Sequence, residues 1–452
     1  MRVPELDKAL GLEVYATETA GIGGVIRSAV DDFVVEEVLV DGSMARIEKN
    51  VATSPALGAS ASKQRFLLCV LVKRNWDTFV AVKNVAEQLG IDQARIQIAG
   101  IKDAKAVTAQ HLTIENVTME ELEKIYVKDI EVRPIGYFRD ELSSFYLLGN
   151  KFTITMKSVK HKTATIEKRL SQTVQEFQAV GGIPNFFGHQ RFGTTRAITH
   201  LVGRAIVNGD FREAMMLFLA KPSPHEHPES RQARQELESK QDFAKASQNY
   251  PRQLRFERLI LGHLAEKLDD FVGAFQRLPI KLQMLFVQAY QSYLFNRFLS
   301  ERIRKGFPLD AAEVGDYVVS VERSGLPMPK TGKLATASSL AEINGMITAG
   351  KLRVALPLVG FRQKLSQGTM GEMEARILES EGVETSRFRV SAIPRISGQG
   401  ELRTVTSPIR EFSQHVTGEG EVKLGFTLLR GSYATMLLRE VMKPFDPIAA
   451  GF

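Results

Sequence analysis

Residues 99–111 read AGIKDAKAVTAQH, and this stretch decides how the whole chain is interpreted. Apolar and polar residues alternate over 95–99, which predicts a β-strand that stops near Gly100. Lys102 and Asp103 follow, so a carboxylate stands beside an ammonium group at a sheet edge or in a cleft. A neighbouring cation keeps a carboxylate ionised, and an ionised carboxylate can act as a nucleophile. For an isolated element of this kind, a solvated surface turn is the simpler interpretation.

The segments around this stretch predict strands toward both ends of the chain and helices in between. The continuous apolar run over 65–72 predicts a buried strand. Asp77 is expected to cap a helix over 78–89, because apolar residues fall at helical spacing there and Gly90 follows as a stop signal. Other strands are expected at 25–28, 32–38, 130–137, 151–159 and 421–429, and other helices at 163–180, 278–304 and 436–442. This order indicates one sheet domain that is interrupted by an inserted domain.

Composition limits the class of protein. The chain has 452 residues, so we expect two domains or one domain with a large insertion. Its 59 Lys and Arg residues exceed its 52 Asp and Glu residues, a mild excess that fits a polyanion-binding protein without requiring one. The single cysteine, Cys69, lies in an apolar run, which excludes a disulfide framework and fits a reducing cytosol. No apolar run reaches the roughly 20 residues of a membrane span, so we expect a cytoplasmic protein that does not enter a membrane.

Several familiar catalytic sites are missing from the sequence. The run Gly21-Ile22-Gly23-Gly24 lacks the third glycine of a dinucleotide-binding motif and precedes an expected strand. His225 and His227 lie in a proline-rich loop without a third metal ligand, so a solvated loop is the better interpretation. There is no Gly-x-Ser-x-Gly motif, and the lone cysteine is expected to be buried. We therefore expect neither a metal nor a cofactor.

Five motifs, the opening one among them, occur in an order that is specific to one family. They are D-F-V-V-E-E at 32–37, G-x-K-D-x-x-A-x-T-x-Q at 100–110, G-N-x-F at 149–152, P-N-x-F-G-x-Q-R-F-G at 184–193 and G-S-Y-A-T-x-x-x-R-E at 431–440. The set resembles the TruD family of pseudouridine synthases, which modify uridine-13 of transfer RNA. The length and the segment 289–296 look more like the archaeal and eukaryotic branch of that family than the shorter bacterial one.

The resemblance implies a fold and a domain arrangement. We expect an α+β pseudouridine-synthase fold, a mixed and largely antiparallel sheet flanked by helices, formed by residues 1–181 and 400–452. Residues 182–399 are expected to form the large, mainly helical α/β insertion called the TRUD domain. Transfer RNA is expected in the cleft between the two domains, with other structured RNA left open as a substrate and no oligomeric state implied. The segment 189–191 is expected to buttress the hinge between them.

The resemblance also implies that Asp103 is the catalytic residue and that no cofactor takes part. The reaction breaks the N1–C1′ bond of uridine and joins C5 to C1′, so the uracil must be held while it turns. A carboxylate can hold it by adding to C6 of the base or to C1′ of the ribose, and both routes stay open. Phe152 is expected to stack on the target base, as an extruded base requires. Asn150 is expected to hydrogen-bond Asp103 or the backbone near it.

The remaining site residues are expected to support Asp103 or to shape the cleft around it. Arg27 stands where many relatives carry Lys, and it is expected to orient Asp103 or to hold a phosphate. Phe33 and Glu36 are expected to shape the same cleft, with core packing as the alternative for Phe33. Lys102 is expected either to pair with a phosphate or to be solvated. Two other functions remain: a noncatalytic RNA-binding or chaperone protein that uses the same cleft, and a hydrolase, which is disfavoured because no partner acid is apparent.

Overall fold

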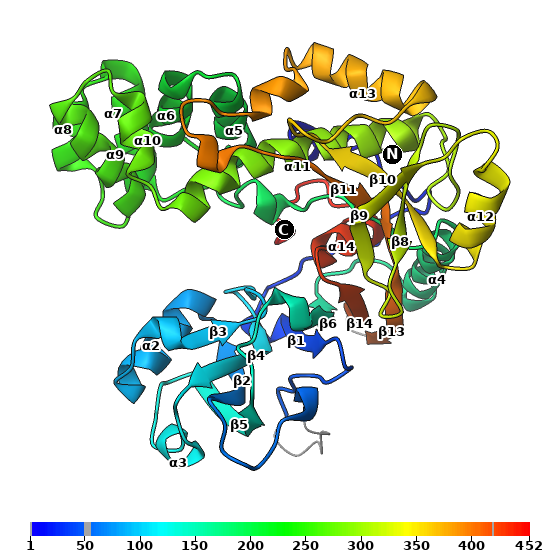
Figure 1. Ribbon diagram of the computed structural model, residues 1–452, viewed down its shortest axis with the longest axis horizontal. Coiled ribbons are helices and arrows are strands. Elements are labelled where there is room, and N and C mark those ends of the chain that lie inside the picture. Colours follow the sequence, from blue (N-terminus) through cyan, green and yellow to red (C-terminus); the bar gives the residue numbers. More distant parts are fainter. Residues whose placement is uncertain (1, 49–55, 418–419) are drawn as a thin grey trace.

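The computed structural model describes residues 2–48, 56–417 and 420–452, and these form two lobes joined on one side (Figure 1). The lower lobe contains an eight-stranded sheet in the order β13-β14-β6-β1-β4-β2-β5, with β3 paired to β4. The strand β1 runs parallel to β4, and the other pairs of this sheet are antiparallel. Its strands are β1 Phe33–Leu39, β2 Phe66–Arg74, β3 Ile96–Ile98, β4 Val107–Glu115, β5 Ile130–Phe138, β6 Leu147–Met156, β13 Ile409–Thr417 and β14 Glu421–Leu429. The expected α+β class with a mixed, largely antiparallel sheet is confirmed.

Helices cover one face of this sheet in two places. The helix α2, Thr78–Leu89, begins where Asp77 accepts hydrogen bonds from the backbone N–H groups of residues 79 and 80, and it ends at Gly90 in the left-handed region. Its apolar side packs on the part of the sheet formed by β2 and β4. The helices α4, Thr163–Ala179, and α14, Ala434–Met442, pack on the part formed by β1, β6 and β14. The face between these two cores is left for the loops and polar side chains described below.

The upper lobe is mainly helical and contains a small second sheet (Figure 1). Its helices are α5 Thr199–Val207, α6 Phe211–Ala220, α7 Pro228–Lys240, α8 Phe243–Asn249, α9 Arg255–Glu266, α10 Phe271–Gln276, α11 Ile280–Arg304, α12 Leu340–Thr348 and α13 Gly368–Ser380. The small sheet has the order β11-β10-β8-β9, from β8 Tyr317–Val321, β9 Pro327–Leu334, β10 Leu352–Leu358 and β11 Glu401–Thr404. The long helix α11 is the axis of the core. Helix α5 approaches it so closely that a Cβ on Gly203 would lie 2.0 Å from the backbone oxygen of Phe286.

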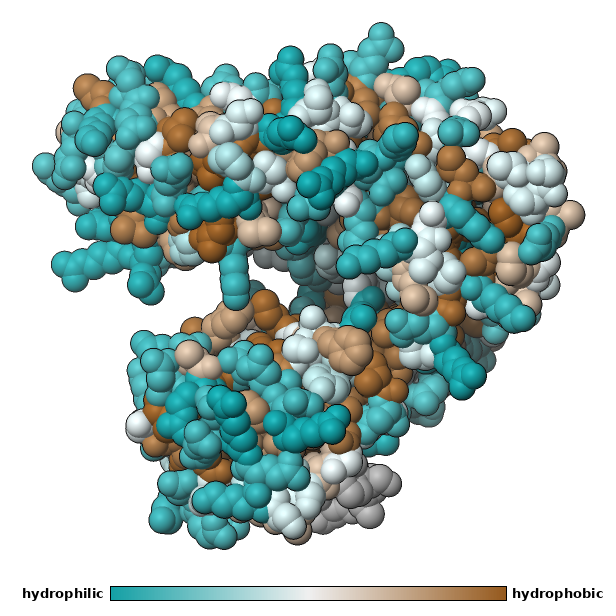
Figure 2. Space-filling model, viewed as in Figure 1, coloured by the Kyte–Doolittle hydropathy of each residue, from teal (hydrophilic) through white to brown (hydrophobic). Residues whose placement is uncertain are grey.

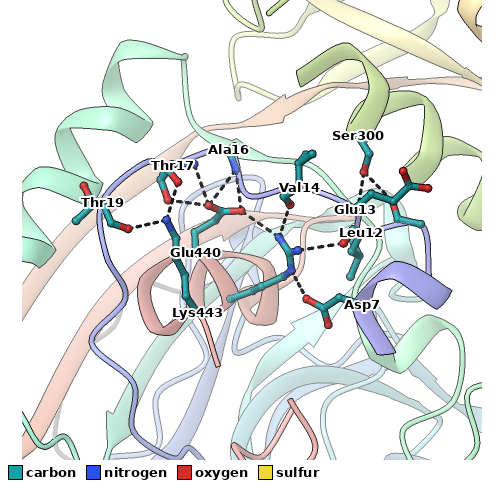
Figure 3. Close-up of polar contacts among 12 residues, drawn as sticks. Asp7, Leu12, Glu13, Val14, Ala16, Thr17, Thr19, Ser300, Glu440 and Lys443 are labelled. Carbon is teal, nitrogen blue, oxygen red and sulfur yellow. Dashed lines mark hydrogen bonds and ion pairs between the residues drawn. The ribbon is translucent and has the colours of Figure 1, made fainter. Parts of the chain in front are cut away.

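The N-terminal segment crosses from one lobe to the other. Its short helix α1, Glu5–Ala9, is followed by residues that pack in the core of the upper lobe. Figure 3 shows the next stretch on α14: Ala16 and Thr17 donate hydrogen bonds to the carboxylate of Glu440, and the ammonium of Lys443 donates to backbone oxygens of Thr17 and Thr19. Asp7 is paired with Arg439 of α14 at 2.6 Å and with His189 at 2.8 Å. The two lobes are therefore joined by buried charges as well as by backbone.

Local sequence signals predicted most element positions. The strand expected at 25–28 is the exception: only Val25 makes an isolated bridge, with Lys157, and Arg27 has a φ of 58°, which a strand does not tolerate. The division into residues 1–181 with 400–452 and 182–399 stays a prediction. No helix in the described ranges is long and apolar enough to cross a membrane.

Candidate active site

A pocket of about 500 Å³ opens where the two lobes meet, and Asp103 lies in its wall. Figure 2 shows the deep hollow that separates the lobes on this face of the molecule. The sheet lobe contributes residues 26–27 and 103–105 to the pocket, and the C-terminal segment contributes residues 448, 451 and 452. Gln190, Thr194, Thr195 and His225 complete it from the far side. Asp103 therefore stands in a cleft and not on an open sheet edge.

The loop that carries Asp103 runs from the end of β3 to the start of β4 and is anchored along its length. The hydroxyl of Thr78 makes hydrogen bonds of 3.1 Å with both the N–H and the carbonyl of Lys102. The side-chain amide of Gln110 donates to the carbonyl of Gly100 at 3.0 Å. The ammonium of Lys73, at the end of β2, donates to the carbonyl of Asp103 at 2.7 Å. The strand stops early because its following residues are held in this loop, which points one carboxylate into the cleft.

Lys73 was not expected from the sequence. Its side chain is fully buried, and burial lowers the pKa of its ammonium group to about 8, although Asp103 opposes that shift. Its second hydrogen bond goes to the carbonyl of Trp76 at 2.8 Å. A lysine that directly continues the apolar run of β2 was the available signal in the sequence.

Arg27 meets Asp103 in the cleft. Its Nη2 lies 2.9 Å from Oδ1 of Asp103, and its Nη1 donates to the carbonyl of Gly451 at 3.1 Å. The guanidinium carbon lies 4.1 Å from the centre of the Phe33 ring. Burial lowers the pKa of Arg27, and the carboxylate of Asp103 opposes that shift. The Asp103 side chain keeps 33% of its surface exposed against 13% for Arg27, which leaves the carboxylate open to an incoming ligand.

Aromatic rings pack beneath Arg27 in the core of the sheet lobe. Phe152 is 6% exposed, and its ring centre lies 6.3 Å from that of Phe33 and 5.4 Å from that of Phe426. Phe33 is buried in the same core, so it both packs inward and supports Arg27. Phe152 does not line the pocket around Asp103. Its stacking on a target base stays a prediction.

Two expected site residues turn away from the cleft. Lys102 was expected to meet a phosphate or solvent, but its side chain is buried and paired with the buried carboxylate of Glu37. Glu36 points to the opposite face of the sheet from Phe33, where its carboxylate accepts a hydrogen bond from the backbone of Ile47 at 3.0 Å. The alternation of side chains along β1 explains the position of Glu36, because it puts residues 33, 35 and 37 on one face of the sheet and residue 36 on the other. Glu37 is the acid that sequence reasoning missed.

Asn150 makes no side-chain hydrogen bond with Asp103 or with any other described residue, contrary to expectation. It pairs in register with Glu37 across β6 and β1, which puts it on the face that carries Phe152. Its Oδ1 is buried without a partner, and so are Oγ1 of Thr108 and Oε1 of Gln110 in the described residues. Buried acceptors and hydroxyls of this kind are costly unless something bonds to them.

The turn η5, His189–Arg191, contacts both lobes. Its Gln190 lies 3.1 Å from the hydroxyl of Thr435 on α14, and its Arg191 donates to the hydroxyl of Ser292 on α11 at 3.1 Å. These contacts place the turn between the lobes, and its role at a hinge stays a prediction. Within the described residues, no group of three or more His, Cys, Asp or Glu side chains has an arrangement that could hold a metal.

Three comparisons with known proteins find the same family. The sequence model of the family described as tRNA pseudouridine synthase D (TruD) matches residues 9–441. A protein of Methanosarcina barkeri described as "Probable tRNA pseudouridine synthase D" is 37% identical over 453 residues, which cover 99% of each chain. A Pyrococcus abyssi protein of the same description is 33% identical and covers 95% of this chain and 98% of its own. The crystal structure of a TruD candidate from Methanosarcina mazei has a TM-score of 0.82 and 35% identity, covering 98% of this chain and 99% of that one.

Proposed function

Because this chain belongs to the tRNA pseudouridine synthase D (TruD) family, we propose that it converts uridine-13 of tRNA to pseudouridine with Asp103 as the nucleophile. The family assignment supports the isomerisation of uridine in tRNA. The position of the uridine and the identity of the nucleophile are more specific than the family assignment. One observation supports Asp103 as the nucleophile: it is a partly exposed carboxylate in the pocket between the lobes, held by a guanidinium that is mostly buried. The choice of uridine-13 follows from the resemblance to the family alone.

The reaction rearranges bonds without changing the composition of the RNA. The N1–C1′ bond breaks, a C5–C1′ bond forms, and the hydrogen of C5 leaves as a proton while N1 gains one. In one route the carboxylate adds to C6 of uracil and carries the base while it turns. In the other it bonds to C1′ and displaces the base as an anion, which then attacks C1′ through C5. The carboxylate is released unchanged in both routes.

Each neighbour of Asp103 has a defined task in this proposal. Arg27 pairs with the carboxylate and fixes its direction, and Lys73 fixes the backbone of the loop behind it. The target base must leave its stack to reach the pocket, which requires an apolar surface for its ring. Phe152, between Phe33 and Phe426, is our candidate for that surface. The buried acceptor of Asn150 fits the N3–H of uracil.

Analysis of the product separates this function from the two alternatives. A tRNA transcript is incubated with the protein, digested to nucleosides and analysed by chromatography, and a transcript with cytidine at position 13 serves as the control. Pseudouridine in the first transcript alone is the expected result. Free uracil would identify a hydrolase, and tightly bound but unchanged tRNA would identify an RNA-binding protein. Pseudouridine in the control transcript would refute the assignment to position 13. Mapping pseudouridines in cells with and without the gene would define any further RNA substrates.

A further inference from the structure

A second pocket, of about 370 Å³, lies on the other side of the turn η5 from Asp103. The two pockets are lined by consecutive residues of that turn: Gln190 faces the pocket of Asp103, and Arg191 faces the second one. Arg403 of β11 and the ring of Phe187 also line the second pocket. Asn185, Phe187 and Arg191 belong to the motif at 184–193, of which only Gln190 lines the pocket of Asp103.

Two guanidinium groups meet at this pocket over one aromatic ring. The guanidinium carbon of Arg403 lies 4.0 Å from the centre of the Phe187 ring, and that of Arg191 lies 5.8 Å from it. Burial lowers the pKa of both groups, and burial together with the charge of Arg191 lowers that of Arg403 to about 10. Two mostly buried cations beside the same ring repel each other, so the site is costly unless an anion is near.

No carboxylate among the described residues pairs with either guanidinium. Arg191 donates to the hydroxyl of Ser292 at 3.1 Å and to the side-chain oxygen of Gln288 at 3.2 Å, both of which are neutral. Arg403 donates to neutral oxygens of Asn185 and Gly431 at 2.7 to 3.0 Å. Glu401 lines the pocket, but it is exposed and makes no ion pair in the described residues.

Each guanidinium also keeps one end free. The hydrogen bonds above use Nε and Nη2 of both side chains, and Nη1 of both has no partner in the described part of the chain. Two free N–H ends at one pocket are the kind of donor that the oxygens of a phosphodiester accept from, and arginine is the side chain best suited to phosphate recognition.

We propose that Arg191 and Arg403 bind a backbone phosphodiester of the RNA strand close to the target uridine. This inference rests on the proposed function for the identity of the ligand, and the turn η5, which lines both pockets, is what relates the second pocket to that of Asp103. The contacts of Arg403 to Asn185 and Gly431 join β11 to the junction of the lobes, so the same side chain also has a structural role. That role explains its three hydrogen bonds but not the absence of a counter-charge.

The test measures binding and not turnover, so that it does not depend on catalysis. The dissociation constant of a tRNA transcript is measured by fluorescence anisotropy over a range of salt concentrations for the wild type, Arg191→Gln, Arg191→Lys and Arg403→Gln. The matched control is Arg212→Gln: Arg212 also lies over a phenylalanine ring, at 5.6 Å, and bonds a glutamine oxygen, but it lines neither pocket. Thermal unfolding of each variant reports whether it folds.

Loss of one phosphate contact should lower the slope of log Kd against log salt by about 0.7 to 0.9 in Arg191→Gln. We expect its affinity at low salt to fall about tenfold, as for one hydrogen bond to a charged group. Arg191→Lys should keep the slope and lose part of the affinity, because it keeps the charge but not the fork. Unchanged slopes in Arg191→Gln, or an equal loss in Arg212→Gln, would overturn the proposal even if Arg403→Gln fails to fold. Pseudouridine formation is scored separately, so a wild type that binds with the expected slope but makes no product refutes only the proposed function.

Discussion

Nη2 of Arg27 lies 2.9 Å from Oδ1 of Asp103, and the other arm of the same guanidinium is held by the carbonyl of Gly451. One planar side chain thus connects the carboxylate to the C-terminal segment. Phe33 lies under the guanidinium and excludes water from its lower face. The direction of the Asp103 carboxylate therefore depends on Arg27, which does not touch the RNA in our proposal.

Replacing Asp103 by Asn tests the nucleophile. The amide is almost the same size as the carboxylate, so the contacts with RNA should be kept. It carries no charge, so the covalent intermediate cannot form. We expect Asp103→Asn to bind tRNA within a few-fold of the wild type and to release essentially no tritium from 5-tritiated uridine. Asp92→Asn is the control, since Asp92 caps a short exposed turn away from the cleft. Substantial tritium release by Asp103→Asn would remove this residue from the mechanism.

Replacing Gly451 by alanine tests the contact between Gly451 and Arg27. Gly451 has a φ of 93°, and a Cβ there would lie 2.2 Å from the carbonyl of Ile26, so alanine must displace the segment that holds Arg27. Gly451→Ala and Arg27→Gln should each lower kcat by about 10- to 100-fold, and the double variant should lose little more, because both act through one contact. Gly209→Ala has a similar φ, 83°, but no neighbour within 4 Å, and it should keep full activity. Additive losses of kcat in the double variant would show that the two residues act independently, contrary to this prediction.

Removal of Lys102 should affect stability and not RNA affinity. Its ammonium is the buried partner of Glu37, whose pKa is lowered by Lys102 and His111 against the effect of burial. Lys102→Met leaves a buried carboxylate without its cation, so we expect the free energy of unfolding in urea to fall by about 3 to 5 kcal/mol at pH 7. The variant Lys105→Met, in the same loop but exposed, should unfold like the wild type. Normal stability with weakened tRNA binding in Lys102→Met would restore the expectation of a phosphate contact.

Lys73 predicts a dependence of stability on pH. Its pKa is about 8 in the folded protein and 10.5 in an ordinary setting, so between these values the unfolded chain holds a proton that the folded one has lost. Stability then rises with pH across this window, by at most about 1.4 kcal/mol per pH unit. The difference in unfolding free energy between the wild type and Lys73→Met should therefore grow from pH 8 to pH 10.5. The exposed Lys83→Met should show a constant difference, and a constant difference for Lys73→Met would contradict the lowered pKa.

The sequence predicted best where short-range signals decide the structure. Asp77 and Gly90 delimit α2 because capping acts within a few residues, and β14 has the predicted bounds, Glu421–Leu429. Glu36 was assigned to the cleft because the motif that contains it was considered as a unit, whereas alternation along β1 separates it from Phe33. The left-handed conformation of Arg27 and the contacts of Gly451 depend on packing across hundreds of residues, and no local pattern reports them.

The contact between Arg27 and Gly451 joins residues that are 424 positions apart in the sequence. Such contacts form late, because a long loop must close before they yield any stabilisation. On the ribosome, residues 33–156 supply five neighbouring strands long before β14 emerges to cover the open edge of β6. A growing chain therefore contains Asp103 and Arg27 but lacks the segment that aligns them. We therefore expect the nascent chain to stay inactive until its C-terminal segment has been synthesised. We also expect molecular chaperones to bind the exposed edge of β6 during this time.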